Sequence, residues 1–189
     1  MNTHRPLTRQ AHELLAEALS PGDIALDATA GNGYDTLFLA QQVGIEGELH
    51  AFDIQARALE HTRARLAAAN CRTPVLLHQR SHAEMLSALP ATARGRVAAV
   101  TFNLGYLPGA DHDTVTRTES TLAALRQSIT LLRPGGMLSV LAYRGHPGGR
   151  EEAEAVAAWC ARQRQLAHVV YESRGPVLHI CRRTREAND

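Results

Sequence analysis

The feature that most constrains this chain is a glycine-rich turn between an apolar run and a helical pattern. The run Ile24–Leu26 leads into Asp27, and the turn Gly31-Asn32-Gly33 follows. Glycine adopts backbone angles closed to other residues, so the backbone can approach a ligand closely. A second apolar run, Leu49–Phe52, ends in Asp53, about 20 residues past the turn, where a carboxylate can accept both hydroxyls of a ribose. The pair predicts a parallel α/β sheet that binds an adenosine-containing cofactor.

The same turn narrows the choice of cofactor. A dinucleotide fingerprint needs a third glycine, and Thr36 stands at that position. The chain contains no lysine, so a phosphate-gripping P-loop is excluded. Asp27 would repel a pyrophosphate, but it suits a cofactor with a cationic centre and an amino acid tail. These features favour S-adenosylmethionine; the alternative is a plain strand-turn-helix unit without a ligand.

Composition places few limits on function. The chain has 189 residues, 44% of them hydrophobic and 21% charged, which is typical of one soluble domain spanning residues 1–189. No apolar stretch approaches the roughly 20 residues of a membrane helix. The N-terminus shows no signal core, so we expect no membrane association and a cytoplasmic location. Three widely spaced cysteines fit neither a disulfide framework nor a zinc site, and no metal is expected.

Apolar runs alternate with helical patterns along the whole chain, which predicts a mostly parallel sheet with helices on both faces. The expected strands are Ile24–Leu26, Glu48–Phe52, Val75–Leu77, Val97–Phe102, Met137–Tyr143, His168–Tyr171 and Val177–Cys181. The expected helices are Pro6–Leu19, one beginning near Asp35, Gln55–Ala69, Thr114–Leu132 and Arg150–Arg164.

The end of the chain refines this fold class. Only a turn separates the last two of the seven strands, which predicts an antiparallel hairpin. A Rossmann-like parallel sheet closed by such a hairpin resembles the class I methyltransferases. The turn Arg133-Pro-Gly-Gly136, placed before the fifth strand, resembles that class as well.

Ligands of open α/β sheets bind outside the carboxyl ends of the strands. Ser81 and His82 follow the third strand, where methyltransferases contact the adenine; the alternative for both is a loop-capping role. The full set of cofactor-binding candidates is Asp27, Thr29, Gly31, Asn32, Gly33, Tyr34, Asp35, Thr36, Asp53, Ile54, Gln55, Ser81, His82 and Asn103.

The segment Asn103-Leu-Gly-Tyr106 after the fourth strand is a second informative pattern. It has the form of the Asn-x-x-aromatic motif of methyltransferases that act on amino nitrogens. The Asn103 oxygen and a backbone carbonyl can accept hydrogen bonds from an amine and aim its lone pair at the methyl group. The Tyr106 ring can stack on a planar base. The alternative is a strand-to-loop turn in which Tyr106 only packs.

A protonated amine cannot attack a sulfonium, so a proton must leave first. Asp111, His112 and His146 are candidates for that base, and the sequence does not rank them. A loop-ordering role is the alternative for each. His61 and His78 read as surface or packing residues, and Trp159 reads as core.

Several segments together resemble the MnmM-like family of tRNA 5-aminomethyl-2-thiouridine methyltransferases, long labelled rRNA methylases. They are Asp27–Thr36, Phe52–Gln55, Ser81-His82, Phe102–His112 and Tyr143–Gly149. The resemblance implies methyl transfer from S-adenosylmethionine to the aminomethyl nitrogen of the wobble uridine. It implies that Asn32, Asp53, Gln55, Ser81 and His82 hold the cofactor, and that Asn103, Tyr106, Asp111, His112 and His146 surround the target. Ala110 departs from the glycine expected there.

Other functions stay open at this point. They are methylation of a ribosomal RNA base or a small amine, and a non-catalytic protein that binds S-adenosylmethionine. The net charge is only +1, so affinity for the tRNA anticodon region would depend on local arginine clusters such as Arg144 with Arg150. A homodimer is one way to extend that basic surface.

Overall fold

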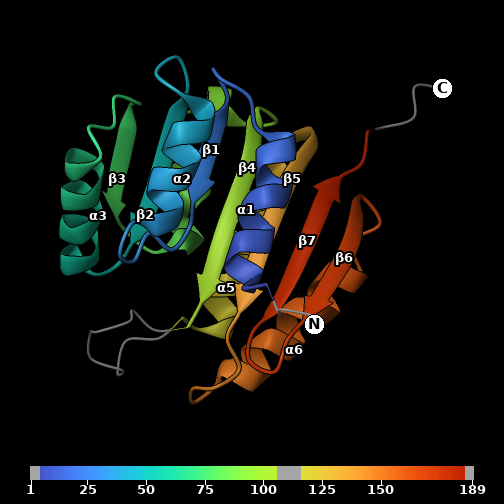
Figure 1. Ribbon diagram of the computed structural model, residues 1–189. Coiled ribbons are helices and arrows are strands. Elements are labelled where there is room, and N and C mark those ends of the chain that lie inside the picture. The colour runs from blue at the N-terminus through green and yellow to red at the C-terminus, as the bar shows by residue number, and fades with distance from the viewer. Residues whose placement is uncertain (1–4, 106–115, 186–189) are drawn as a thin grey trace.

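The computed structural model describes residues 5–105 and 116–185. A seven-stranded sheet forms its centre, in the order β3-β2-β1-β4-β5-β7-β6 (Figure 1). The five strands from β1 to β5 are parallel, and β7 runs antiparallel to both β5 and β6. The strands are β1 Ile24–Asp27, β2 Glu48–Asp53, β3 Val75–Gln79, β4 Val97–Leu104, β5 Leu132–Ala142, β6 Leu166–Glu172 and β7 Val177–Arg183. The predicted parallel sheet with a final hairpin is confirmed.

Helices cover both faces of this sheet. Three of them, α1, α2 and α3, lie on one face, and α5 and α6 lie on the other (Figure 1). Their bounds are α1 Leu7–Ala18, α2 Tyr34–Val43, α3 Ala56–Ala68, α5 Thr118–Leu131 and α6 Gly149–Ala161. None of the helices in the described ranges is long and apolar enough to span a bilayer.

The core divides into two layers because neighbouring residues of a strand point to opposite faces. Ala25 packs with Leu15 of α1 and Leu39 of α2, whereas Leu26 belongs to the cluster that contains Leu125 of α5. Trp159 of α6 is buried in that second cluster, as predicted. Helix α1 packs on β5 and β7, so the first helix rests on strands made near the end of the chain.

Strand β5 differs from the prediction at its start. The segment Arg133–Gly136, expected as a turn before the strand, lies within β5 as an irregularity of the pairing with β4. Val97 pairs with Leu132, but Ala99 pairs with Met137, so the intervening residues bulge from the ladder. The Arg133 guanidinium fixes the bulge by donating to both carboxylate oxygens of Asp23, at 2.6 and 3.0 Å.

Helix boundaries and short helices account for the other differences. Helix α5 begins at Thr118, and residues 114–115 of its expected start lie outside the described ranges. Helix α6 ends at Ala161, three residues before the expected Arg164. Between β3 and β4 the chain forms η1 His82–Glu84, α4 Met85–Ala88 and η2 Ala91–Ala93, none of which was predicted. Elements this short carry too few apolar residues to show a helical period.

Candidate active site

The carboxyl ends of β1 and β2 meet through a direct hydrogen bond. The backbone N–H of Gly31 donates to Oδ2 of Asp53 at 3.0 Å, and the N–H of Gln55 donates to Oδ1 at 2.9 Å. Burial raises the pKa of Asp53, while the backbone bonds from Gln55 and Gly31 act in the opposite direction. The glycine turn and the carboxylate, paired by sequence spacing alone, therefore form one side of a common site.

Helix α3 holds the glycine turn in place. Gly33 has a positive φ of 77°, and a Cβ there would lie 2.7 Å from Cα of Thr62. This close approach lets the Thr62 hydroxyl donate to the Gly31 carbonyl at 3.2 Å, while Nε of Arg65 donates to the Asn32 carbonyl at 2.7 Å. Only glycine satisfies both the conformation and the contact.

Two predicted cofactor residues in the turn contact α3. The amide oxygen of Asn32 lies 3.0 Å from Nδ1 of His61, a residue predicted to be surface or packing. The Arg65 guanidinium stacks on the Tyr34 ring, 3.5 Å from its centroid. Tyr34 is still 65% exposed, so most of its ring remains accessible.

Asp27 does not reach the surface of the site. It is fully buried, where it accepts from the Thr36 hydroxyl at 2.6 Å and from the Thr29 N–H at 3.1 Å. Burial, helped by the charge of Asp35, raises the pKa of Asp27 to about 7. We expected this carboxylate to face a cationic cofactor. In the structure no part of Asp27 is accessible, and its carboxylate instead links β1 to the first turn of α2 through Thr36.

Asn103 belongs to a network drawn from three elements. Its backbone N–H donates to the Thr29 hydroxyl at 2.7 Å, and its Nδ2 donates to Oδ2 of Asp35. The other oxygen of Asp35 lies 2.5 Å from Nε2 of His12, whose ring stacks on Phe38 with centroids 3.9 Å apart. Asp35 was predicted only as a cofactor contact, and His12 was missed. The available signal was a histidine beside Ala11 on the buried side of the first helix.

Tyr143, at the end of β5, is a second residue that the residue-by-residue analysis missed. Its N–H donates to the Leu104 carbonyl at 3.1 Å, so it stands beside the segment that carries Asn103. Burial and the negative charge of Asp35 raise the pKa of Tyr143. The ring is nevertheless 39% exposed and can contact a ligand.

The loop after β5 meets the loop after β4 at His146. A Cβ placed on Gly105 would lie 3.6 Å from Nε2 of His146, and one on Gly149 would lie 2.6 Å from the same atom. His146 therefore sits beside Gly105, two residues past Asn103, and its place near the target stays a prediction. The other three catalytic candidates, Tyr106, Asp111 and His112, lie outside the described residues.

The predicted cofactor residues after β2 and β3 differ in how accessible they are to a ligand. Ile54 is 55% exposed beside Asp53 and offers an apolar surface. Ser81 accepts from the Ala83 N–H at 3.2 Å and so caps η1, the alternative considered for it. His82 is buried edge-on against Phe102, and burial lowers its pKa to about 4, which keeps the ring neutral.

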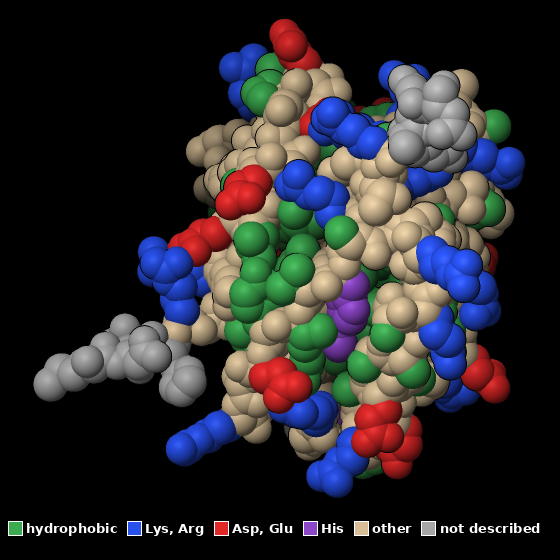
Figure 2. Space-filling model, turned by 90° about the vertical axis from the view of Figure 1, so that its right-hand side faces the viewer, with side chains coloured by type: hydrophobic (Ala, Val, Ile, Leu, Met, Phe, Trp, Pro, Cys, Tyr) green, Lys and Arg blue, Asp and Glu red, His purple; other side chains and the backbone are tan. Residues whose placement is uncertain are grey.

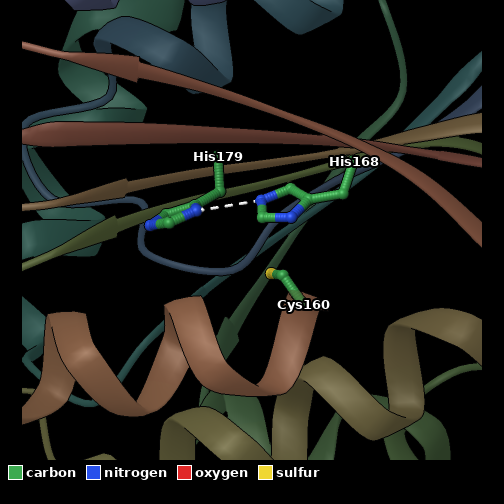
Figure 3. A group of neighbouring side chains, drawn as sticks. All are labelled: Cys160, His168 and His179. Atoms are coloured by element: carbon green, nitrogen blue, oxygen red, sulfur yellow. Dashed lines mark hydrogen bonds between the residues drawn. The ribbon is translucent and has the colours of Figure 1, made fainter. Parts of the chain in front are cut away.

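A separate cluster lies between α6 and the final hairpin. The side chains of Cys160, His168 and His179 each offer one atom that could bind a metal ion, and these three atoms lie within 4.8 Å of one another (Figure 3). Sequence spacing gave no sign of this grouping, because β7 and β6 bring the two histidines together. The imidazoles bond to each other at 3.0 Å, and burial lowers the pKa of His179 to about 4. The mutual bond gives each neutral ring a partner inside the sheet–helix layer.

Comparison with known proteins agrees with this geometry. Residues 49–174 match the family described as "Putative rRNA methylase". The tRNA (mnm(5)s(2)U34)-methyltransferase, chloroplastic, of Arabidopsis thaliana is 41% identical over 160 residues, which are 80% of this chain but 58% of that protein. The chain thus spans less than two thirds of that relative's length.

Solved structures share nearly the whole fold. A "putative rRNA-methylase" from Clostridium thermocellum is 34% identical with a TM-score of 0.89, covering 96% of this chain and 99% of that one. A "putative methyltransferase" from Streptococcus mutans, solved in complex with SAH, is 30% identical with a TM-score of 0.83, covering 95% and 98%. The matched segment holds Asp53, Asn103 and Tyr143, and the predicted class I methyltransferase fold is confirmed. This chain belongs to the family described as "Putative rRNA methylase".

Proposed function

We propose that this protein transfers a methyl group from S-adenosylmethionine to the amino nitrogen of 5-aminomethyl-2-thiouridine at the tRNA wobble position. The observation that carries the proposal is the fixed orientation of the Asn103 amide. Because Nδ2 donates to Asp35, the Asn103 oxygen remains as the acceptor for an amine. The likeness to the Arabidopsis tRNA methyltransferase supports the same substrate.

The residues at the carboxyl ends of β1 and β2 fit the cofactor. Asp53 accepts backbone bonds from Gly31, Gln55 and Ile54, and a carboxylate, with about four acceptor positions, can still accept a ribose hydroxyl. Exposed Ile54 would pack on the adenine, and the backbone of the Gly31–Gly33 turn would approach the amino acid tail. Bound S-adenosylmethionine would supply a methyl group on a sulfonium, which an amine attacks directly without a covalent enzyme intermediate.

Asn103, Leu104 and Tyr143 would present the amine. The Asn103 oxygen and the second lone pair of the Leu104 carbonyl can each accept an amine N–H, which directs the nitrogen lone pair toward the cofactor side. Holding the two reacting atoms in this geometry would supply a large part of the rate acceleration. Tyr106 and the exposed Tyr143 ring would stack on the uracil.

Arginines near the carboxyl ends of the strands would bind the anticodon stem-loop. Arg57, Arg80 and Arg150 follow β2, β3 and β5 and are exposed, as is Arg174 in the hairpin turn. Arg144 holds the turn between β6 and β7 in place, because its guanidinium donates to the carbonyls of Ser173 and Gly175 at 2.9 and 3.0 Å. Phosphate binding would therefore rest on the exposed arginines.

The outer strand β6 offers a surface for a homodimer. Among the described strands it pairs with β7 alone, and Val169 and Val170 on it are 50% and 43% exposed. Figure 2, which faces that side of the molecule, shows apolar side chains gathered beside histidine, with both basic and acidic side chains around them. A second copy of the chain would cover this edge. Separately, we propose that the enzyme acts in the cytoplasm, where its tRNA substrate is found. Light scattering of the wild type and of Val169→Lys tests the dimer.

The deciding experiment is mass spectrometry of tRNA nucleosides. tRNA that bears 5-aminomethyl-2-thiouridine is incubated with the protein and S-adenosylmethionine. A gain of one methyl group on that nucleoside supports the proposal. Cofactor binding without such a gain would move the target to ribosomal RNA or a small amine. A protein that binds the cofactor but methylates none of these would be a non-catalytic binder.

A further inference from the structure

Asp35 is the point where three elements converge in the candidate site. Its carboxylate, in the first turn of α2, bonds through one oxygen to His12 of α1 and through the other to Asn103 of β4. The side chains of His12 and Asp35 are 28% and 18% exposed, so the pair reaches the surface while it is mostly enclosed. Each carboxylate oxygen retains a lone pair, because one hydrogen bond uses only one.

Acidic groups gather around Asp35 in this corner of the site. Asp27 of β1 lies close enough for the Asp35 charge to raise its pKa, and Asp53 of β2 acts on Asp27 as well. Tyr143 of β5 has its pKa raised by the same charge, after burial. Among the described neighbours in this network, His12 is the one basic side chain. Such a corner favours a cation, and an alkylamine is mostly protonated at pH 7.

We propose that the Asp35 carboxylate binds the protonated amine of the substrate and takes its proton, and that His12 is the positioning residue that holds Asp35 for this step. The inference rests on the proposed function and adds a residue role to it. Asp35 is bonded directly to Asn103, the residue that would present the amine. Of the three bases suggested by the sequence, Asp111 and His112 lie outside the described residues.

The step balances without any further reactant. An N–H bond of the ammonium breaks and its electron pair stays on nitrogen, while the proton forms an O–H bond on Asp35. Rotation about the C–N bond of the amine turns the freed nitrogen pair toward the cofactor, where it forms the bond to the methyl carbon. The carbon–sulfur bond breaks at the same time, and its electron pair goes to sulfur. The product is a protonated secondary amine, and the proton on Asp35 leaves to solvent at the exposed edge of the pair.

His12 would act by fixing the orientation of the Asp35 carboxylate. Its ring lies parallel to Phe38 with an interplanar angle of 0°, which leaves Nε2 aimed at Asp35. A carboxylate held by two donors keeps its orientation, and the Asn103 amide bonded to it keeps its own. Loss of the imidazole would therefore loosen both the base and the residue that presents the amine.

The test compares pH–rate profiles for methylation of tRNA bearing 5-aminomethyl-2-thiouridine, together with calorimetric affinity for S-adenosylhomocysteine. Asp35→Asn keeps the size of the side chain and removes its ability to take the proton. We expect kcat/KM to fall about 10² to 10⁴-fold at pH 7 and to recover as the pH rises and free amine becomes available. Affinity for S-adenosylhomocysteine should change less than about threefold, because the ribose contact at Asp53 is intact.

Two variants of His12 separate positioning from a structural role. His12→Gln retains an N–H donor and should keep most of the activity, whereas His12→Ala should lose at least about tenfold. Glu17→Gln, an exposed change on the same helix, is the matched control. A pH profile of Asp35→Asn parallel to that of the wild type, or equal losses of rate and cofactor affinity, would overturn the inference. An inactive wild-type protein would instead overturn the proposed function, and the inference with it.

Discussion

The backbone N–H of Gly31 donates to the Asp53 carboxylate, and this one bond joins the ends of two neighbouring strands. The turn that is predicted to approach a ligand and the carboxylate that is predicted to bind its ribose are therefore positioned together. A substitution at either residue should therefore shift the position of the other.

Asp53→Ala should weaken S-adenosylmethionine binding about 10 to 100-fold. The variant loses the predicted ribose contact and leaves the Gly31 and Gln55 N–H groups without their acceptor. Titration calorimetry measures the effect, and Glu46→Gln, an exposed change elsewhere, serves as the control. Unchanged affinity would remove Asp53 from the cofactor site.

Gly33→Ala should destabilise the protein by more than about 2 kcal/mol. The added Cβ would meet Thr62 at 2.7 Å while the residue holds a φ of 77°. Gly22→Ala is a matched control, because Gly22 has a similar φ of 88° with open space around it. Denaturant unfolding of both variants separates backbone strain from the clash. Equal losses would show that α3 yields easily at Thr62.

Acidic pH should stabilise the fold through Asp27. Its pKa is raised from 3.8 to about 7 in the folded protein, so between these values the folded state holds a proton that the unfolded chain has released. This contribution to stability is complete below about pH 4 and is lost as the pH rises through 7. Asp27→Asn should flatten the dependence of Tm on pH across that window. An unchanged slope would mean that another group, such as Asp53, controls it.

Arg150→Glu should weaken tRNA binding and reduce its dependence on salt concentration. An arginine that contacts a phosphate releases counterions, so removing one contact lowers the slope of log K against log salt by about 1. Arg164→Glu, an exposed change in the turn before β6, is the control at the opposite end of the strands. Arg144→Glu is a poorer test, since it would also release the hairpin turn. Equal effects of the Arg150 and Arg164 variants would argue against binding at the carboxyl edge.

The sequence predicted those parts of the site that follow strand ends. Asp53 and Asn103 were found because parallel strands bring their carboxyl ends to one edge. His12 could not be found in this way, since it lies within a helix and nothing in its spacing shows that α1 lies against α2. Asp27 was expected to face the cofactor, because a pattern of residue types does not reveal which side of a turn is buried. The bulge at Arg133–Gly136 was missed for a similar reason: Pro and Gly signal a break, and pairing across the break depends on the neighbouring strand.

Helix α1 is made first, yet it packs on β5 and β7, which are made late. His12 can reach its place over Asp35 only when α1 has a surface on which to dock. A nascent or truncated chain that lacks the final hairpin would lack part of this docking surface. We therefore expect His12 to stay away from Asp35 in such a chain, so that completion of the last strand controls when the acceptor side of the candidate site is assembled.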